Sequence, residues 1–149
     1  AYNQPSPRVA AQIAREAALG LERPETYERF RQRCEASRDA LKRLLVDLKR
    51  QGKRVVGYGA TSKSTTIMCY SGVTPELIEF ISDTTPTKQN KLSPGAHIPV
   101  LPPQRFWDDY PDYAVLFAWN HAKEIMARET DFVARGGKWI VHVPEVRVL

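Results

Sequence analysis

A glycine-rich stretch carries the residue types best suited to binding a phosphate group. It follows a short apolar run, precedes a segment of helical character, and contains Gly57, Tyr58, Gly59, Ala60, Thr61, Ser62, Lys63 and Ser64. The dinucleotide fingerprint G-x-G-x-x-G is met at Gly57 and Gly59. The Walker pattern G-x-x-x-x-G-K-[ST] is met at the same first glycine, at Lys63 and at Ser64. Both patterns fail at Ser62, where each requires a further glycine, so the stretch fully matches neither.

The physical features of this stretch favour anion binding. A helix that begins here presents unpaired backbone N–H groups and a partial positive charge, and Lys63 adds a formal charge. A tight turn capped by Ser62 would explain the glycines, but it would not explain a cation in the first helical turn. Phosphoryl transfer is disfavoured, because the fourth apolar run ends in Trp119-Asn120 rather than in an Asp that could hold magnesium. We expect phosphate or backbone contacts at Gly57, Gly59, Ser62, Lys63 and Ser64.

Other residues that could contact a ligand are expected at the same edge of the fold. Asp83 closes the second apolar run, 26 positions after Gly57, where dinucleotide-binding domains often place an acid that contacts ribose. An ordinary turn or capping role explains Asp83 equally well. Lys88 lies in segment 84–107, which has no acidic residue. This segment is either a basic loop beside a bound diphosphate or an ordinary surface connection. Three candidates follow the fourth apolar run, namely Trp119, Asn120 and His121, and the alternative roles are core packing for Trp119 and helix capping for Asn120.

The elements that must position these residues alternate between strand and helix. Apolar runs predict five strands, at residues 55–59, 77–82, 97–101, 113–118 and 139–143. Helices are predicted between them, at residues 62–70, 102–107 and 120–135. Strands joined by helical crossovers form a mainly parallel sheet with helices on both faces. We therefore predict a Rossmann-like α/β fold with a mainly parallel five-stranded sheet, in which His142 is a hydrogen-bonded core residue.

The first third of the chain is predicted to be helical. A short helix ends at Gly20, and a longer one is expected from Pro24 to about Gln51. Apolar residues in the longer helix recur at intervals of three and four and mark one stripe. We expect a helical N-terminal arm, residues 1–53, that packs on a Rossmann-like domain, residues 54–149.

The net charge of +5 is unevenly distributed. Residues 1–54 hold 13 Lys or Arg and 7 Asp or Glu, whereas residues 55–149 hold 9 and 10, so the basic excess belongs to the predicted arm. Alternation of sign along a helix is typical of a solvent-exposed face, and no aromatic motif accompanies the charge, so no nucleic-acid partner is expected. No apolar run is long enough for a membrane span, and two cysteines without a pairing pattern favour the cytoplasm. No spacing of His, Cys and Asp predicts a metal site.

Several short blocks occur in the order that is typical of one enzyme family. They are Gly57-Tyr58-Gly59-Ala60 with Lys63, Asp83, Lys88-Gln89, residues 94–99, Ala118-Trp119-Asn120, residues 135–138 and Val143-Pro144-Glu145. In this order they resemble the C-terminal domain of the sugar C-methyltransferases, over essentially the whole chain. These enzymes use S-adenosylmethionine to methylate a carbon of a nucleotide-linked deoxysugar ketone. The chain departs from the pattern at Thr61-Ser62, where many members have Pro-Ala, and at Ser64, where they have Gly, which leaves the identity of the sugar open.

The resemblance implies a function for the chain as one part of a larger enzyme. In the family, a zinc domain and a methyltransferase domain that holds S-adenosylmethionine precede this domain, and the general base is expected in the methyltransferase domain. The resemblance therefore implies that this domain binds the nucleotide sugar, contains no catalytic residue, has the upstream methyltransferase domain as its partner and is inactive alone. Two alternatives stay open: an NAD(P)-binding fragment of an oxidoreductase, and a scaffold or nucleic-acid module that uses the basic helix.

Overall fold

The computed structural model describes residues 5–149, and the chain forms two compact units, Ala1–Ala36 and Ser37–Leu149. The first unit holds helix α1 (Pro7–Ala18) and the beginning of helix α2 (Pro24–Arg50). A proline at the first helical position suits both helices, because the N–H that it lacks would have no partner there. Gly20, at φ +69°, adopts the left-handed conformation that ends α1. The two predicted helices are confirmed.

A seven-stranded sheet forms the centre of the second unit, in the order β3-β4-β2-β1-β5-β6-β7. The strands are β1 (Val55–Tyr58), β2 (Ile81–Ser82), β3 (Lys91–Leu92), β4 (Pro99–Leu101), β5 (Tyr113–Leu116), β6 (Lys138–Val141) and β7 (Arg147–Val148). The five inner strands of this order, β4, β2, β1, β5 and β6, pair in parallel. They correspond to the five predicted strands. The predicted Rossmann-like α/β class with a mainly parallel sheet is therefore confirmed.

The predicted number of strands is wrong, because an antiparallel strand is added at each edge of the sheet. These strands, β3 and β7, have only two residues each, are exposed, and have no apolar run from which they could be predicted. The predicted strand 77–82 is also shorter than expected, because Leu77 and Ile78 donate to Thr74 O in a turn. The backbone of Glu79 and Phe80 still bonds to β1, so the segment enters the sheet before β2 begins.

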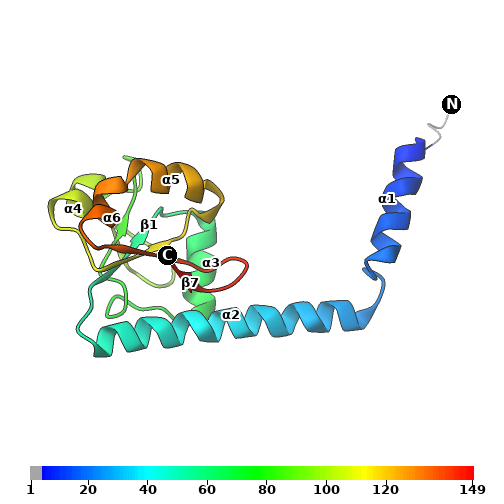
Figure 1. Ribbon diagram of the computed structural model, residues 1–149, viewed down its shortest axis with the longest axis horizontal. Coiled ribbons are helices and arrows are strands. Elements are labelled where there is room, and N and C mark those ends of the chain that lie inside the picture. The colour runs from blue at the N-terminus through cyan, green and yellow to red at the C-terminus, as the bar shows by residue number, and fades with distance from the viewer. Residues whose placement is uncertain (1–4) are drawn as a thin grey trace. The chain divides into compact units, whose positions relative to one another are not determined.

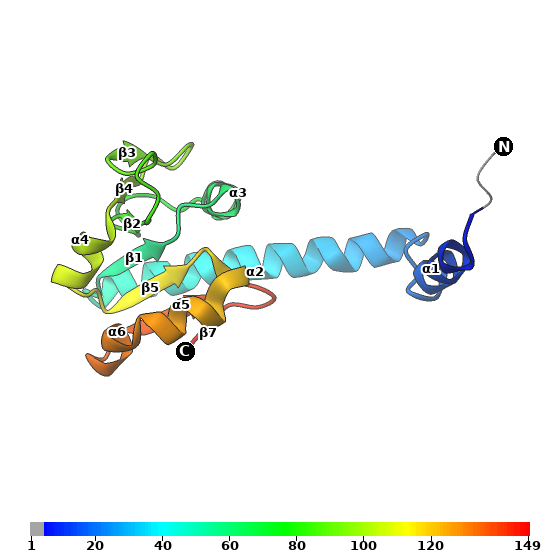
Figure 2. The same ribbon diagram turned by 90° about the horizontal axis from the view of Figure 1, so that it is seen from above.

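Helices cover both faces of the sheet (Figures 1 and 2). They are α3 (Ser62–Ser71), α4 (Pro103–Asp108), the 3-10 helix η1 (Trp119–His121), α5 (Ala122–Arg128) and α6 (Thr130–Ala134). The single helix predicted over residues 120–135 is wrong in one respect. The backbone leaves the helical region at Glu129, with φ −92° and ψ 45°, and this break separates α5 from α6.

Two clusters of buried side chains form the core, one on each face of the sheet. Leu41, Leu45 and Leu48 of α2 pack with α3 on the first face, as the predicted apolar stripe requires. On the other face, α4, α5 and α6 cover a cluster of aromatic rings that includes Tyr58 and Trp139. The chain therefore buries its apolar residues in two layers against one sheet.

His142 follows β6 and is buried, but it is not the hydrogen-bonded core residue that was predicted. Within the described part of the chain, neither ring nitrogen of His142 has a hydrogen-bond partner. Its imidazole lies edge-on to the Phe117 ring, with the ring centroids 6.0 Å apart. Burial lowers the pKa of His142 to about 4, so the buried ring is neutral at pH 7.

Candidate functional site

The sheet order creates a crevice between β1 and β5. The chain runs from β1 to β2 and β4 on one side, and then crosses to β5 and β6 on the other side of β1. Ligands of open α/β sheets bind at such a switch point, outside the carboxyl ends of the strands. The prediction that the fourth strand lies beside the first is confirmed by the parallel pairing of β1 with β5.

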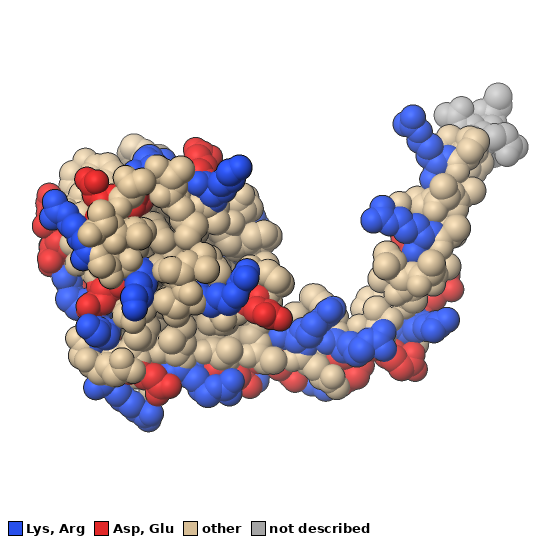
Figure 3. Space-filling model, viewed as in Figure 1, with Lys and Arg blue, Asp and Glu red and all other residues tan. Residues whose placement is uncertain are grey.

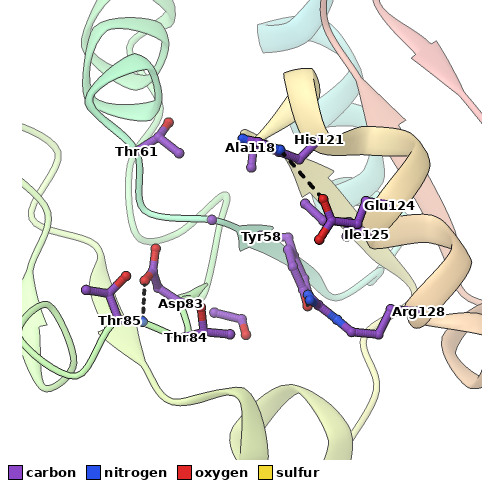
Figure 4. Close-up of a pocket in the computed structure, with 12 residues that line it drawn as sticks. Tyr58, Thr61, Asp83, Thr84, Thr85, Ala118, His121, Glu124, Ile125 and Arg128 are labelled. Carbon is purple, nitrogen blue, oxygen red and sulfur yellow. Dashed lines mark hydrogen bonds and ion pairs between the residues drawn. The ribbon is translucent and has the colours of Figure 1, made fainter.

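A cavity of about 270 Å³ opens at this point (Figure 4). Its wall comes from the carboxyl ends of β1, β2 and β5 and from α5. The residues that line it are Tyr58, Gly59, Thr61, Ser82, Asp83, Thr84, Thr85, Ala118, His121, Glu124, Ile125 and Arg128.

Only some of the predicted site residues form the wall of this cavity. Gly59, Asp83 and His121 line it. The remaining predicted residues lie outside the wall: Gly57, Ser62, Lys63, Ser64, Lys88, Trp119 and Asn120. The structure therefore brings together one residue from each of three predicted segments: the glycine loop, the end of the second strand, and the segment after the fourth strand.

The glycine loop is held in shape by contacts within the protein. Thr61 is the N-cap of α3, because its side chain accepts a hydrogen bond from the Ser64 N–H at 3.1 Å. The Ser64 hydroxyl is buried and donates back to Thr61 O at 2.6 Å. Within the described chain, the N–H groups of Ser62 and Lys63 make no hydrogen bond. The first turn of α3 therefore keeps two backbone donors for an anion, whereas the Ser64 hydroxyl is already used.

Packing between strands explains both glycines of the loop. A Cβ on Gly57 would lie 2.7 Å from the Phe117 ring, so this position of β1 admits no side chain. Gly59 has φ +88°, and a Cβ there would lie 2.8 Å from the Cβ of Ala118. Both glycines therefore let the chain at β1 lie close to the segment that follows β5. Gly57 also lets β1 pack closely against β2.

Asp83, at the end of β2, stabilises the glycine loop through hydrogen bonds to its carboxylate. Its carboxylate accepts hydrogen bonds from the Ala60 N–H and the Thr85 N–H, both at 2.7 Å, and lies 3.4 Å from Lys88 Nζ. Burial alone would raise the pKa of Asp83, but the hydrogen bonds from Thr85 and Ala60 and the charge of Lys88 outweigh burial and hold this pKa below its ordinary value. Both carboxylate oxygens of Asp83 therefore already have protein partners.

Lys88 and Lys63, which lie outside the cavity wall, and His121, which lines it, also have partners. Lys88 Nζ donates to Ala60 O at 2.8 Å, so this lysine ties its own loop to the glycine loop. Lys63 Nζ lies over the indole ring of Trp119, 5.3 Å from the ring centroid. His121 Nδ1 lies 3.8 Å from Glu124 Oε2, and both side chains are exposed at the rim of the cavity.

A buried polar cluster beside the cavity was missed by the sequence reasoning. The carboxylate of Glu129 accepts hydrogen bonds from Tyr58 Oη at 2.6 Å, Trp107 Nε1 at 2.9 Å and Arg128 Nε at 3.2 Å. Arg128 Nη2 also donates to Tyr58 Oη at 3.0 Å. Burial and the hydrogen bond to Glu129 raise the pKa of Tyr58 to about 12, so the phenol is neutral and can donate.

Comparison with known proteins identifies the family. The sequence profile of the C-methyltransferase C-terminal domain matches residues 1–144. The chain belongs to this family. This C-methyltransferase C-terminal domain is 38% identical to the C-methyltransferase NovU of Streptomyces niveus over 143 residues. The aligned region is 96% of this chain and 34% of NovU, so the chain spans about a third of the length of that curated relative.

In this C-methyltransferase C-terminal domain, the cavity wall contains hydrogen-bond donors that suit a polar or anionic ligand. Thr61, Thr84 and Thr85 lie on one side of the cavity, and Arg128 lies on the other (Figure 4). Ser82 also lines it. In the range that the structure describes, no three His, Cys, Asp or Glu side chains are placed to hold a metal ion. None of the helices described is both long enough and apolar enough to cross a membrane.

Proposed function

We propose that this chain is the sugar-nucleotide-binding domain of an S-adenosylmethionine-dependent C-methyltransferase that acts on a nucleotide-linked deoxysugar. The observation that carries the proposal is a cavity with hydroxyl donors and one guanidinium at the β1/β5 switch point of a C-methyltransferase C-terminal domain. Gly59, Asp83 and His121 form part of this binding site. Contacts from the other predicted residues stay predictions: Gly57, Ser62, Lys63, Ser64, Lys88, Trp119 and Asn120.

The size of the cavity limits what it can hold. A volume of about 270 Å³ is near the lower end of small-molecule pockets, which range from about 300 to 1,000 Å³. A nucleoside with a phosphate therefore fits better than a whole nucleotide sugar. The sugar end of the ligand would extend out of the crevice, where another domain could reach it.

Positioning is the chemical contribution that we propose for this domain. Methyl transfer to carbon requires removal of a proton next to the ketone, stabilisation of the enolate, and a sulfonium held in line with the carbon. We place S-adenosylmethionine, the general base and any zinc in the remainder of the enzyme. Holding the nucleotide in the crevice fixes the position of the sugar, which lowers the entropic cost of reaching the transition state.

We propose that the partner of this domain is the upstream methyltransferase domain of the same polypeptide. The aligned region is 34% of NovU, so this curated relative is about three times as long as the region that it shares with the chain. In the first unit, four large apolar side chains are exposed on α1 and α2: Val9, Ile13, Tyr27 and Phe30. Exposed apolar side chains on adjacent helices are typical of a surface that another domain covers. The isolated chain would then bind its ligand but transfer no methyl group.

The two alternative functions have less support. The acid of an NAD(P) site accepts hydrogen bonds from the ribose hydroxyls, whereas the Asp83 carboxylate already accepts from the N–H groups of Ala60 and Thr85, which leaves fewer of its lone pairs for a ribose. For a nucleic-acid module, the basic helix would need charge that is not neutralised nearby. Arg31 is paired with Glu28 and Glu35, and positive and negative side chains are interspersed along α2 (Figure 3).

Calorimetry on the 149-residue chain tests the proposed function. Titration with dTDP-sugars and GDP-sugars should give saturable binding of one class, and titration with S-adenosylmethionine should give no heat of binding. The proposal would be overturned if the chain bound S-adenosylmethionine and responded to no nucleotide sugar. Saturable binding of NAD(P) in place of nucleotide sugars would support the oxidoreductase alternative.

A further inference from the structure

We propose that Arg128, and not a lysine of the glycine loop, binds the phosphate of the nucleotide, and that Glu129 and Tyr58 hold its guanidinium in position. This inference rests on the proposed function and assigns the group that recognises the anionic part of the ligand.

The geometry of Arg128 leaves part of its guanidinium available to a ligand. Nε donates to Glu129 and Nη2 donates to Tyr58, as described above. Within the described residues, Nη1 has no hydrogen-bond partner, and 51% of the side chain is exposed. Arg128 lies in the wall of the cavity, on the opposite side from Asp83 (Figure 4). A guanidinium with unused donors in a cavity wall is well suited to bind a phosphate, which accepts hydrogen bonds from an arginine in pairs.

The buried carboxylate of Glu129 explains why Arg128 is held so firmly. Glu129 is 4% exposed and accepts hydrogen bonds from three different side chains, so its position is fixed. Burying a carboxylate contributes little to stability even when it is paired, because the desolvation penalty offsets the attraction. The break between α5 and α6 also occurs at Glu129. A network that adds little stability but fixes an arginine beside a cavity favours a role in binding, because less side-chain entropy is lost when the ligand binds.

The other charges near the cavity favour the same assignment. Among the described residues that line the wall, Arg128 is the one lysine or arginine, while Asp83 and Glu124 are acidic. Lys63 lies over the Trp119 ring, and Lys88 is bound to Ala60 O beside Asp83. An anion that enters a cavity with two carboxylates in its wall requires a cation there, and Arg128 provides it.

Binding measurements with variants test the assignment. Each variant is titrated with dTDP, UDP and GDP by calorimetry, and with the matching nucleosides by ligand-observed NMR. Arg128→Met should weaken binding of the preferred diphosphate about 10- to 100-fold, because a charge-assisted pair of hydrogen bonds is lost. Its nucleoside affinity should change less than about twofold, and so should every affinity of Arg43→Met, which removes an exposed arginine of α2.

Two further variants keep the test informative if Arg128→Met folds poorly. Arg128→Lys retains the charge but not the planar donor geometry, and should lose about 3- to 10-fold in diphosphate affinity. Glu129→Gln should also weaken diphosphate binding while leaving nucleoside affinity unchanged, because Glu129 acts only through the orientation of Arg128. A purely structural role would lower both affinities together.

The outcomes separate this inference from the proposed function. If Arg128→Met binds diphosphates as tightly as Arg43→Met, or if nucleoside and diphosphate affinities fall equally, the assignment of Arg128 is wrong while nucleotide binding stands. If Lys63→Met produces the selective loss of diphosphate affinity, the loop lysine is the phosphate ligand. If the unsubstituted chain binds none of the nucleotides or nucleotide sugars, the proposed function itself is wrong.

Discussion

Removal of a single hydroxyl group tests whether the Glu129 network exists as described. Tyr58→Phe deletes the hydrogen bond to Glu129 at 2.6 Å and the acceptor for Arg128 Nη2 at 3.0 Å, and leaves the aromatic ring in place. Glu129 is buried, so water cannot replace the lost donor without rearrangement. Hydrogen bonds to charged groups contribute about 1.5–3 kcal/mol each, so we expect the free energy of unfolding to fall by about 2 kcal/mol. For a chain of this length, such a loss lowers Tm by about 4–8 °C.

Urea unfolding followed by circular dichroism measures this change. The matched control is Tyr70→Phe, because Tyr70 is exposed and its hydroxyl has no hydrogen bond to another described residue. The control should alter the free energy of unfolding by less than about 0.5 kcal/mol. If Tyr58→Phe behaves like Tyr70→Phe, the hydroxyl does not interact with a buried carboxylate, and the network does not fix Arg128.

Two further predictions concern buried positions of the fold. The pKa of His142 is lowered to about 4 in the folded chain, so protonation of the unfolded state should reduce the free energy of unfolding progressively from about pH 6.5 to pH 4, by up to about 3 kcal/mol. Urea unfolding measured across this range should show that His142→Leu loses this pH dependence. The control His97→Asn, at an exposed position, should keep it. If the free energy of unfolding varied with pH in the same way in both variants, the burial of His142 would be contradicted. Gly59→Ala should destabilise the chain by about 2–4 kcal/mol, because it combines a left-handed φ with a clash against Ala118. Gly52→Ala has a similar φ and open space around it, so thermal melts should show only the strain of about 1–2 kcal/mol, and equal losses would show that the contact with Ala118 is not close.

The class of fold could be predicted because its signals are local. Each of the five parallel strands is marked by an apolar run, and turn residues separate these runs from the helices. The edge strands β3 and β7 could not be predicted, since two exposed residues show no periodicity and their pairing depends on the position of the neighbouring strand. The break at Glu129 was missed for a similar reason, because the partners that bury this carboxylate lie 71 and 22 positions away in the sequence.

The location of the candidate site could be predicted better than its charged residues. The loop, the end of the second strand and the end of the fourth strand do meet at one cavity, because parallel strands place their carboxyl ends at one edge. Lys63 and Lys88 were predicted to bind phosphate because they lie in or near recognised motifs, yet neither lies in the cavity wall. Arg128 comes from a helix that carries no motif, and only the three-dimensional structure brings it beside Tyr58.

The central claim is that nucleotide sugars bind at the β1/β5 crevice of this domain. The most direct measurement is a ¹⁵N-labelled NMR titration of the 149-residue chain with the nucleotide sugar that calorimetry identifies. We expect amide shifts to concentrate at Gly59, residues 83–85, His121 and Arg128, with smaller changes in residues 7–30. Shifts confined to residues 7–30, or no shift with any nucleotide sugar, would contradict it.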